Sequence, residues 1–272
     1  MKQTILSMNI RNFLFLLFAL GTLESCEDKL QFSPKDPVFK YVIEGIVQNE
    51  TGSCKVTISQ SKNFEDPNTF VGVSKAVVQI ENKGLIRVLS ETSPGIYQDL
   101  SLKGIPGQAY RLKVKIGEQE FNAVSTMPGV VHFVSFSLNA ADYDPVRTEA
   151  KIGFKDPAGL GNYYWFQELI NNKLQRNFKV VSDEFVNGQN ISEYLVYENR
   201  TKDITKNVMK GDKLVAEMHC IEAPVYTYLF SLSGADGSGE GLPASNPQGN
   251  ISGGALGFFS AQTVERKTVV VP

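Results

Sequence analysis

Short runs of alternating apolar and polar residues, separated by turn residues, recur along most of this chain. Tyr41–Gln48 and Lys55–Gln60 are two such runs, joined by a turn at Asn49–Ser53. Alternation places apolar side chains on one face of a strand, so repeated short runs predict an antiparallel β fold. Further runs lie at 76–81, 85–90, 96–100, 110–116 and 120–125.

The spacing of these runs predicts an Ig-like, Greek-key β-sandwich over residues 39–127. Met127-Pro128-Gly129 ends the pattern, because proline and glycine stop strands and break their pairing. The core of this sandwich is expected to contain Val42, Ile46, Val56, Ile58, Val78, Ile80, Tyr97, Tyr110, Leu112, Val114 and Phe121.

Residues 128–272 are predicted to form a second antiparallel β domain with one short helix. Strands are expected at 130–138, 148–154, 163–170, 173–181, 195–197, 214–221, 254–260 and 264–271. The helix is expected to have Pro224 near its first turn, where proline is tolerated, and to end at Gly234. Its apolar residues follow helical spacing: Val225, Tyr228, Leu229 and Leu232. The predicted fold class is therefore mainly β.

Residues 1–25 have the layout of a lipoprotein signal peptide. Basic residues precede an unbroken apolar run, Phe13–Leu20, which is much shorter than the ~20 residues that a spanning helix needs. Translation can start at Met1 or at Met8, since the segment after Met8 is already a complete signal. Residues 26–38, which are polar and interrupted by proline, are expected to form a tether ahead of the fold.

Leu23-Glu24-Ser25-Cys26 resembles the bacterial lipobox, in which a small residue precedes the cysteine that becomes lipidated. The small Ser25 lets the peptidase reach the bond, and the Cys26 thiolate is the nucleophile that takes the diacylglycerol. Several acyl chains, each stabilising the attachment by ~0.8 kcal/mol per buried CH₂, make such an anchor effectively permanent. Glu24 departs from the usual pattern, and a cleaved signal with an incidental cysteine is the alternative.

A second resemblance extends over nearly the whole chain after Cys26. It rests on Glu44-Gly45, on Tyr97, on Gly104-Ile105-Pro106-Gly107 before Tyr110, and above all on Asn246–Phe259, which reads NPxxNIxGGALGFF. These residues resemble the outer-membrane lipoprotein family of Bacteroidota labelled domain of unknown function 4249. The resemblance implies a lipoprotein that accompanies TonB-dependent outer-membrane transporters, and it supplies no catalytic residue.

The location implied is the outer membrane, with a lipid anchor at Cys26. Glu27 and Asp28, next to that cysteine, resemble the surface-export signal of Bacteroidota lipoproteins. We therefore expect the protein on the cell surface rather than on the periplasmic face.

Neither catalysis nor metal binding is predicted. His132 and His219 fall in separate predicted strands, and His219 and Cys220 point to opposite faces of theirs. No motif pairs a nucleophile with a base, so we expect no catalytic residue and no cofactor. The net charge of −2 argues against a phosphate-binding groove, so nucleic acid is not an expected partner. Cys54 and Cys220 are either buried free thiols or, since export permits it, a disulfide.

One candidate binding segment is the aromatic run Tyr163–Phe166. As a strand it places aromatic side chains on both faces. Tyr164 and Phe166 therefore belong either to the core or to an exposed partner surface, where aromatic residues are enriched.

The other candidate segment is Asn246–Phe259. Asn246 and Asn250 either bond local backbone groups or face a ligand. Gly253-Gly254 indicates a backbone with positive φ or a close approach of strands.

The expected function is that of a membrane-anchored accessory lipoprotein that binds a nutrient or presents it to a TonB-dependent transporter. Loops and exposed aromatic residues on a rigid β scaffold would supply the binding surface. The alternative is a structural or assembly lipoprotein of an envelope complex that binds no small ligand. An envelope hydrolase is a third class, for which no motif is present. The ligand itself is unknown.

Overall fold

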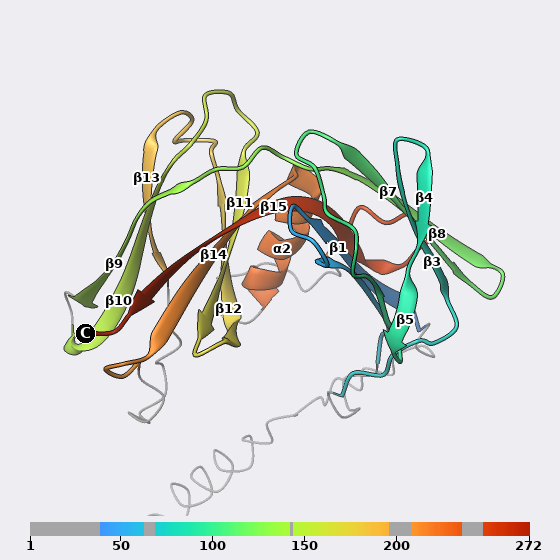
Figure 1. Cartoon of the computed structure of the whole chain (residues 1–272), viewed down its shortest axis with the longest axis horizontal. Coiled ribbons are helices and arrows are strands. Elements are labelled where there is room, and N and C mark those ends of the chain that lie inside the picture. The colour runs from blue at the N-terminus through green and yellow to red at the C-terminus, as the bar shows by residue number, and fades with distance from the viewer. Residues whose placement is uncertain (1–38, 63–68, 142–143, 196–207, 236–246) are drawn as a thin grey trace, which may run out of the picture. The chain divides into compact units, whose positions relative to one another are not determined.

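The strands of the first half match the predicted runs closely. The computed structural model describes residues 39–272 apart from 63–68, 142–143, 196–207 and 236–246 (Figure 1). The strands up to residue 127 are β1 (Tyr41–Gln48), β2 (Cys54–Gln60), β3 (Val77–Asn82), β4 (Leu85–Val88), β5 (Ser90–Ser93), β6 (Ile96–Asp99), β7 (Ala109–Ile116) and β8 (Gln119–Thr126). The sequence does not predict β5, because all of its residues are exposed and no alternation marks it.

Two groups of hydrogen-bonded strands enclose the first hydrophobic core. One is the sheet β4-β3-β7-β8, and the other is the series β1-β2-β6-β5 within a larger sheet. The predicted core residues found buried between them are Val56, Ile58, Val78, Ile80, Tyr97, Tyr110, Leu112, Val114 and Phe121. The mainly β, sandwich-type fold is confirmed.

The prediction for β1 is wrong by one residue. Ile43 and Val47 are buried in the first core, whereas Val42 and Ile46 are not. Both faces of β1 carry apolar residues, so alternation alone does not select the inward face. Gly45 lies on the face of Ile43, where a Cβ would be 2.9 Å from an aromatic side chain of the neighbouring strand. A glycine was needed on the crowded face.

The second half contains further strands and one described helix. They are β9 (Phe133–Ala141), β10 (Asp144–Lys155), β11 (Tyr163–Ile170), β12 (Lys173–Ser182), β13 (Asn190–Leu195), β14 (Lys213–Ile221), α2 (Ala223–Ala235) and β15 (Leu256–Val270). The helix predicted around Pro224 is confirmed. The strand predicted at 195–197 is instead β13, and residues 196 and 197 lie outside the described residues.

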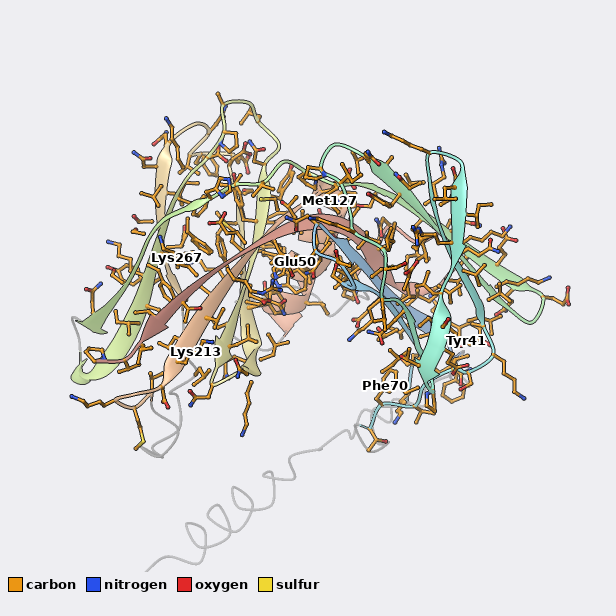
Figure 2. All side chains as sticks on the ribbon, in the orientation of Figure 1. Tyr41, Glu50, Phe70, Met127, Lys213 and Lys267 are labelled. Atoms are coloured by element: carbon orange, nitrogen blue, oxygen red, sulfur yellow. The ribbon has the colours of Figure 1, made fainter. Side chains whose placement is uncertain are left out.

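Two further clusters of apolar residues stabilise this half. The second core contains residues from the sheet β13-β10-β9 and from β11 and β14, among them Phe154 and Tyr164. A third cluster lies between α2 and the other face of the large sheet, and includes Trp165, Val225 and Phe258. Side chains fill both halves of the fold, with Met127 and Glu50 close to where they meet (Figure 2). Both faces of β11 are therefore covered.

The strands predicted at 254–260 and 264–271 are one continuous strand, β15. Its residues 256–262 pair in parallel with β1, and residues 263–270 pair antiparallel with β14. The result is a sheet ordered β12-β11-β14-β15-β1-β2-β6-β5 (Figure 1). The two-strand prediction is wrong because the change of partner requires no turn. Ala261, Gln262 and Thr263 at that point are all buried.

Residues Phe39–Pro272 form one compact unit. The first core consists mainly of residues up to 127 but also contains Ile251, Phe259 and Ala261, whereas the second core contains only residues after 127. The strand β15 lies in the large sheet between β1 and β14. The domain boundary at 127–128 stays a prediction. Cys54 and Cys220 are buried free thiols in different cores, which confirms the first of the two alternatives. No helix in the described part of the chain combines the length and apolar character that crossing a bilayer requires.

Candidate functional site

On the edge of β15 that faces away from β1, side chains form hydrogen bonds with the backbone groups of Phe259 and Ala261, as a neighbouring strand would. Phe259 N donates to Asn250 Oδ1, and Asn250 Nδ2 donates to Phe259 O, each at 2.8 Å. Further along the same edge, Ala261 N donates to Ser125 Oγ at 2.9 Å. Phe259 and Ala261 are fully buried, so water cannot bond these backbone groups. Asn250 thus takes the place of a strand residue.

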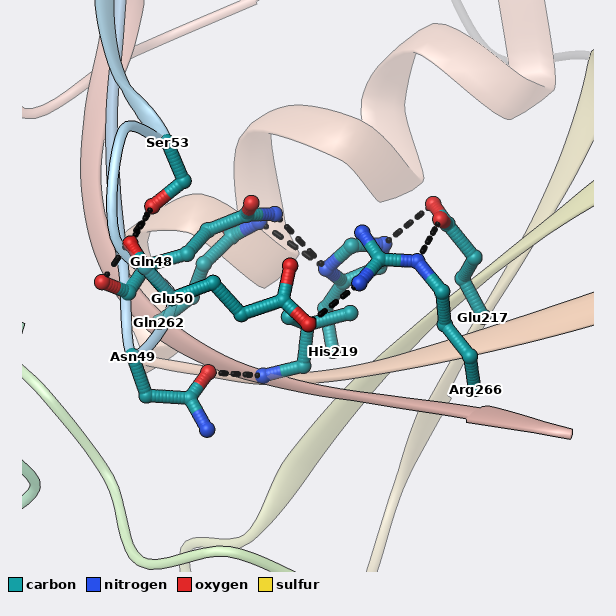
Figure 3. A network of polar contacts seen from close by, with 9 residues as sticks. Gln48, Asn49, Glu50, Ser53, Glu217, His219, Gln262 and Arg266 are labelled. Carbon is teal, nitrogen blue, oxygen red and sulfur yellow. Dashed lines mark hydrogen bonds and ion pairs between the residues drawn. The ribbon is translucent and has the colours of Figure 1, made fainter. Parts of the chain in front are cut away.

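A second polar group occupies the point where β15 changes partner (Figure 3). Nε2 of Gln262 lies 3.0 Å, and Nε2 of Gln48 3.5 Å, from Nδ1 of the buried His219 ring. Two amide donors directed at Nδ1 place the ring proton on Nε2. His219 Nε2 lies 3.4 Å from Glu217 Oε2, without the alignment of a hydrogen bond.

The charged members of this group are two carboxylates, Glu217 and Glu50, and one guanidinium, that of Arg266. Burial lowers the pKa of His219 and outweighs the nearby Glu217 carboxylate, so the imidazole is neutral at physiological pH. Burial opposes ionisation of Glu217, yet its contacts with His219 and Arg266 lower its pKa. Arg266 binds both Glu217 and Glu50 of the turn after β1 (Figure 3). The polar atoms mostly face one another, so this group holds the junction of β1, β14 and β15 together.

The described residues also form a pocket of about 550 Å³ at one end of β11 and β14. Its walls are the β8–β9 connection, the β10–β11 loop and the corner between β14 and α2. The lining residues come from Pro128–Val131, Pro157, Gly161–Tyr164 and Cys220–Pro224. Clefts of this volume accommodate small organic ligands.

Two buried carboxylates fix the loop wall of this pocket. Asp156 accepts hydrogen bonds from the Tyr164 hydroxyl and from a backbone amide of the β12–β13 loop. Asp183 accepts from Gly161 N and from Asn162 Nδ2, each at 3.1 Å. Burial and the adjacent Asp156 raise the pKa of Tyr164, so its hydroxyl remains a donor. The loop is therefore held in place before any ligand binds.

Tyr163 and Glu222 are the lining residues of the pocket whose side chains carry an aromatic ring beside α2 and a charge. The Tyr163 ring centroid lies 5.0 Å from that of Tyr226 on α2, and Tyr226 stacks on Phe230 at 5.7 Å. Glu222 Oε2 accepts from Ser125 Oγ at 2.7 Å and from a backbone amide of β8 at 2.9 Å. Glu222 Oε1 has no hydrogen-bond partner among the described residues.

The predicted binding residues are not brought together, although one of them, Tyr164, is among the residues that line the pocket. Tyr164 and Phe166 are 0% and 1% exposed and pack in the second core, so they form no exposed aromatic surface. The sheet β13-β10-β9 covers their face of β11, which is why an aromatic run of this kind is buried. Asn250 bonds the backbone of β15. Asn246 and the predicted lipidation residue Cys26 lie outside the described residues, as do the predicted signal peptide and tether.

The conformation expected at Gly253-Gly254 is present. Both residues have positive φ, 96° and 87°. A Cβ on Gly253 would lie 2.5 Å from the carbonyl oxygen of Glu120, whereas a Cβ on Gly254 would meet nothing within 4 Å. Gly253 is therefore restricted by space and φ, and Gly254 by φ alone.

Asn162 and Glu222 of the pocket carry no signal in the sequence. They lie sixty residues apart, Asn162 just before β11 and Glu222 just after β14. They come to the same pocket because β11 and β14 pair antiparallel, with Tyr163 opposite Ile221. Within the part of the chain that the structure describes, no three His, Cys, Asp or Glu side chains gather as a metal-binding group.

The fold and the pocket define a mainly β protein with a small-molecule-sized cleft at the end of its central sheet. The chain belongs to the family described as domain of unknown function DUF4249, whose model matches residues 27–268. Among solved structures, it is similar to one described as a "putative carbohydrate binding protein" from Bacteroides uniformis. That match has 8% identity and a TM-score of 0.26, over 85% of this chain and 98% of the other. Backbones that differ so much support no transfer of function. The search of curated proteins found no match.

Proposed function

We propose that this protein is a lipid-anchored accessory protein of the outer membrane, exposed at the cell surface. In this role it binds a nutrient and presents it to a TonB-dependent transporter. The observation that carries the binding role is the pocket at the end of β11 and β14. Because Asp156 and Asp183 hold its wall in place, a ligand does not have to order the loop, which favours affinity.

The proposed anchor is the lipid on Cys26, and its support is the lipobox-like Leu23-Glu24-Ser25-Cys26. Replacing Cys26 with Ala should move the protein from the membrane fraction to the soluble fraction, since the acyl chains are lost. Fractionation of cells that express each form measures this. A Cys26→Ala variant that sediments with membranes like the wild type would place the anchor elsewhere.

The proposed role is non-catalytic. The His219 imidazole is buried among amides and the Glu217 carboxylate, and His132 contacts Glu265 at the surface. Neither histidine has a described contact with a hydroxyl or thiol that it could activate as a nucleophile.

Ligand binding is tested by thermal unfolding of the purified protein with panels of saccharides, peptides and metal chelates. A ligand that binds only the native state raises the melting temperature. The same ligand should leave a Tyr163→Ala variant unshifted, because Tyr163 lines the pocket. A ligand that stabilises both proteins equally binds elsewhere.

A structural or assembly role is the second candidate, favoured by the outer face of the sheet β4-β3-β7-β8. A second pocket, of about 340 Å³, lies there beside Ile86 and Val124. Ile86, Val88 and Val124 are 58%, 62% and 48% exposed, and apolar groups of this kind mark protein contacts. Co-purification of a transporter that is lost in an Ile86→Glu, Val88→Glu variant, without any stabilising ligand, would favour this role.

A further inference from the structure

The charged side chains that line the pocket at the end of β11 and β14, or that bond its loop wall, have one sign. Glu222 is the charged residue among those that line it. Asp156 and Asp183 lie directly behind the loop wall, where Asp156 bonds Tyr164 and Asp183 bonds Asn162. One carboxylate thus lines the pocket, and two more lie behind its loop wall.

Basic side chains do not balance these carboxylates. Lys155 is next to Asp156 in sequence, but strand alternation turns it to the outer face of β10, where it is exposed. The hydrogen bonds of Asp156 and Asp183 come from a tyrosine, an asparagine and backbone amides, which are neutral donors. The negative charge at the pocket is therefore uncompensated by the side chains that line it or bond its walls.

Glu222 has acceptor capacity left for a ligand. Its Oε2 is held by Ser125 and by the amide of Thr126, which fixes the carboxylate at the pocket wall. Oε1 has no partner among the described residues. A carboxylate oxygen in this position accepts a hydrogen bond from an ammonium group, and such charge-assisted bonds are among the stronger ones.

The Tyr163 ring adds a second attraction for a cation. Tyr226 and Phe230 brace it from the side of α2, with Tyr163 and Tyr226 centroids 5.0 Å apart. The electron-rich face of a tyrosine attracts an ammonium group that lies within ~6 Å of the ring centre. An anion would meet both the ring face and the carboxylates unfavourably.

We propose that this pocket binds a ligand that presents an ammonium group, with Glu222 Oε1 accepting its hydrogen bond and the Tyr163 ring facing it. The inference rests on the proposed binding function and adds the charge class of the ligand. It excludes anionic nutrients from this pocket.

Three probes of one ring size test the charge preference: cyclohexylammonium, cyclohexanol and cyclohexanecarboxylate, titrated by NMR at neutral pH. Cyclohexylammonium should bind the wild type about tenfold more tightly than cyclohexanol, since one such contact supplies roughly 1–2 kcal/mol. Cyclohexanecarboxylate should show no saturable binding. The resonances of Tyr163 should shift with the ammonium probe.

Glu222→Gln should abolish the preference for the ammonium probe and leave cyclohexanol binding unchanged. Glutamine keeps an acceptor for Ser125 and Thr126, so the fold is retained, and a melting curve checks this. Glu120→Gln is the matched control, because it removes the same charge from β8 outside the pocket. It should bind all three probes like the wild type.

Three outcomes overturn the proposal: a carboxylate probe that binds as tightly as the ammonium, a preference that survives Glu222→Gln, or no saturation by any probe at about 10 mM. These outcomes are distinct from failure of the proposed function. A neutral nutrient that stabilises the wild type but not Tyr163→Ala would keep that function and end this inference.

Discussion

Buried and half-buried polar side chains occur in two regions of this protein, and the glutamates of the two regions differ in how completely they are bonded. Along β15, Asn250 and Ser125 bond backbone groups, and Gln262 bonds His219. Around β11, the carboxylates Glu222 and Glu168 each keep an oxygen without a partner in the described structure. The first region closes the fold, whereas the second retains unused hydrogen-bonding capacity.

Glu168 shows the contrast most clearly. It is 6% exposed on β11, and burial raises the pKa of its carboxyl to about 7. Partners lower the pKa of Glu217, on the neighbouring strand β14, although it too is buried. The pKa values of two glutamates on paired strands therefore shift in opposite directions. Among the described side chains, only Glu217 has a cationic neighbour, which is Arg266.

The largest effect is expected at Gly257, where β15 meets β1. Its φ is 101°, and a Cβ would lie 2.0 Å from the carbonyl oxygen of Ile43. Gly257→Ala should therefore destabilise by more than about 4 kcal/mol. Gly254→Ala is the control, with positive φ but open space, and should destabilise by about 1–2 kcal/mol. Urea unfolding of both variants gives the comparison, and equal losses would mean that β15 does not lie this close to β1.

Asn250→Ala should give the next largest loss. It leaves the buried N–H and C=O of Phe259 without partners, and each orphaned group costs about 1–3 kcal/mol. We expect a loss of about 4 kcal/mol from the two groups together. Asn250→Asp, which can still accept from Phe259 N, should lose less. A normal melting temperature with lost ligand or transporter association would show instead that Asn250 is a binding residue.

Glu168 should make stability fall as pH rises. Its pKa in the folded state is about 7, above the ordinary 4.5. The free energy of unfolding is therefore highest below pH 4.5, where the carboxyl is neutral in both states, and it falls as pH rises through 7. The loss is of order 3 kcal/mol at most. Glu168→Gln should remove this component. Denaturant unfolding of both proteins at about pH 5 and pH 8 measures it, and parallel pH profiles would contradict burial of an unpartnered carboxyl.

The smallest effect is expected at Glu222. Glu222→Gln keeps an acceptor for Ser125 and for the amide of Thr126, so the free energy of unfolding should change by less than about 1 kcal/mol. Its effect should appear in binding instead. A large loss of stability from this substitution would show that the Glu222 carboxylate stabilises the fold, as the polar residues along β15 do.

The sequence predicts best the strands that bury only one of their two faces. The strands β7 and β8 alternate buried and exposed residues along most of their length. Both strands are predicted, and their predicted core residues, Tyr110, Leu112, Val114 and Phe121, are buried. In β1 and β15 apolar residues occur on both faces, and there alternation gives the wrong face for β1 and two strands for β15. Which partner a buried strand meets depends on the rest of the chain.

The site could not be predicted in the same way. Tyr164 and Phe166 attract notice as aromatic residues. Tyr164 does line the pocket, together with Tyr163 and Glu222, but Phe166 lies away from it in the second core. Both faces of β11 are covered, so most of its aromatic side chains lie in the cores. The pocket lies at the end of the strand. For Asn250 the sequence leaves two roles open, and the hydrogen bonds to the backbone of Phe259 are those of the backbone-bonding role.

The position of β15 in the chain has a consequence for how the protein folds. Every other described strand precedes it, yet it supplies the central pairing for both β1 and β14. The parallel pair of β1 with β15 joins residues more than two hundred positions apart, and such distant contacts form slowly. Until β15 arrives, two long strand edges stay unpaired and open to aggregation. A chain that acquires this strand last can complete its eight-stranded sheet only when its final residues become available.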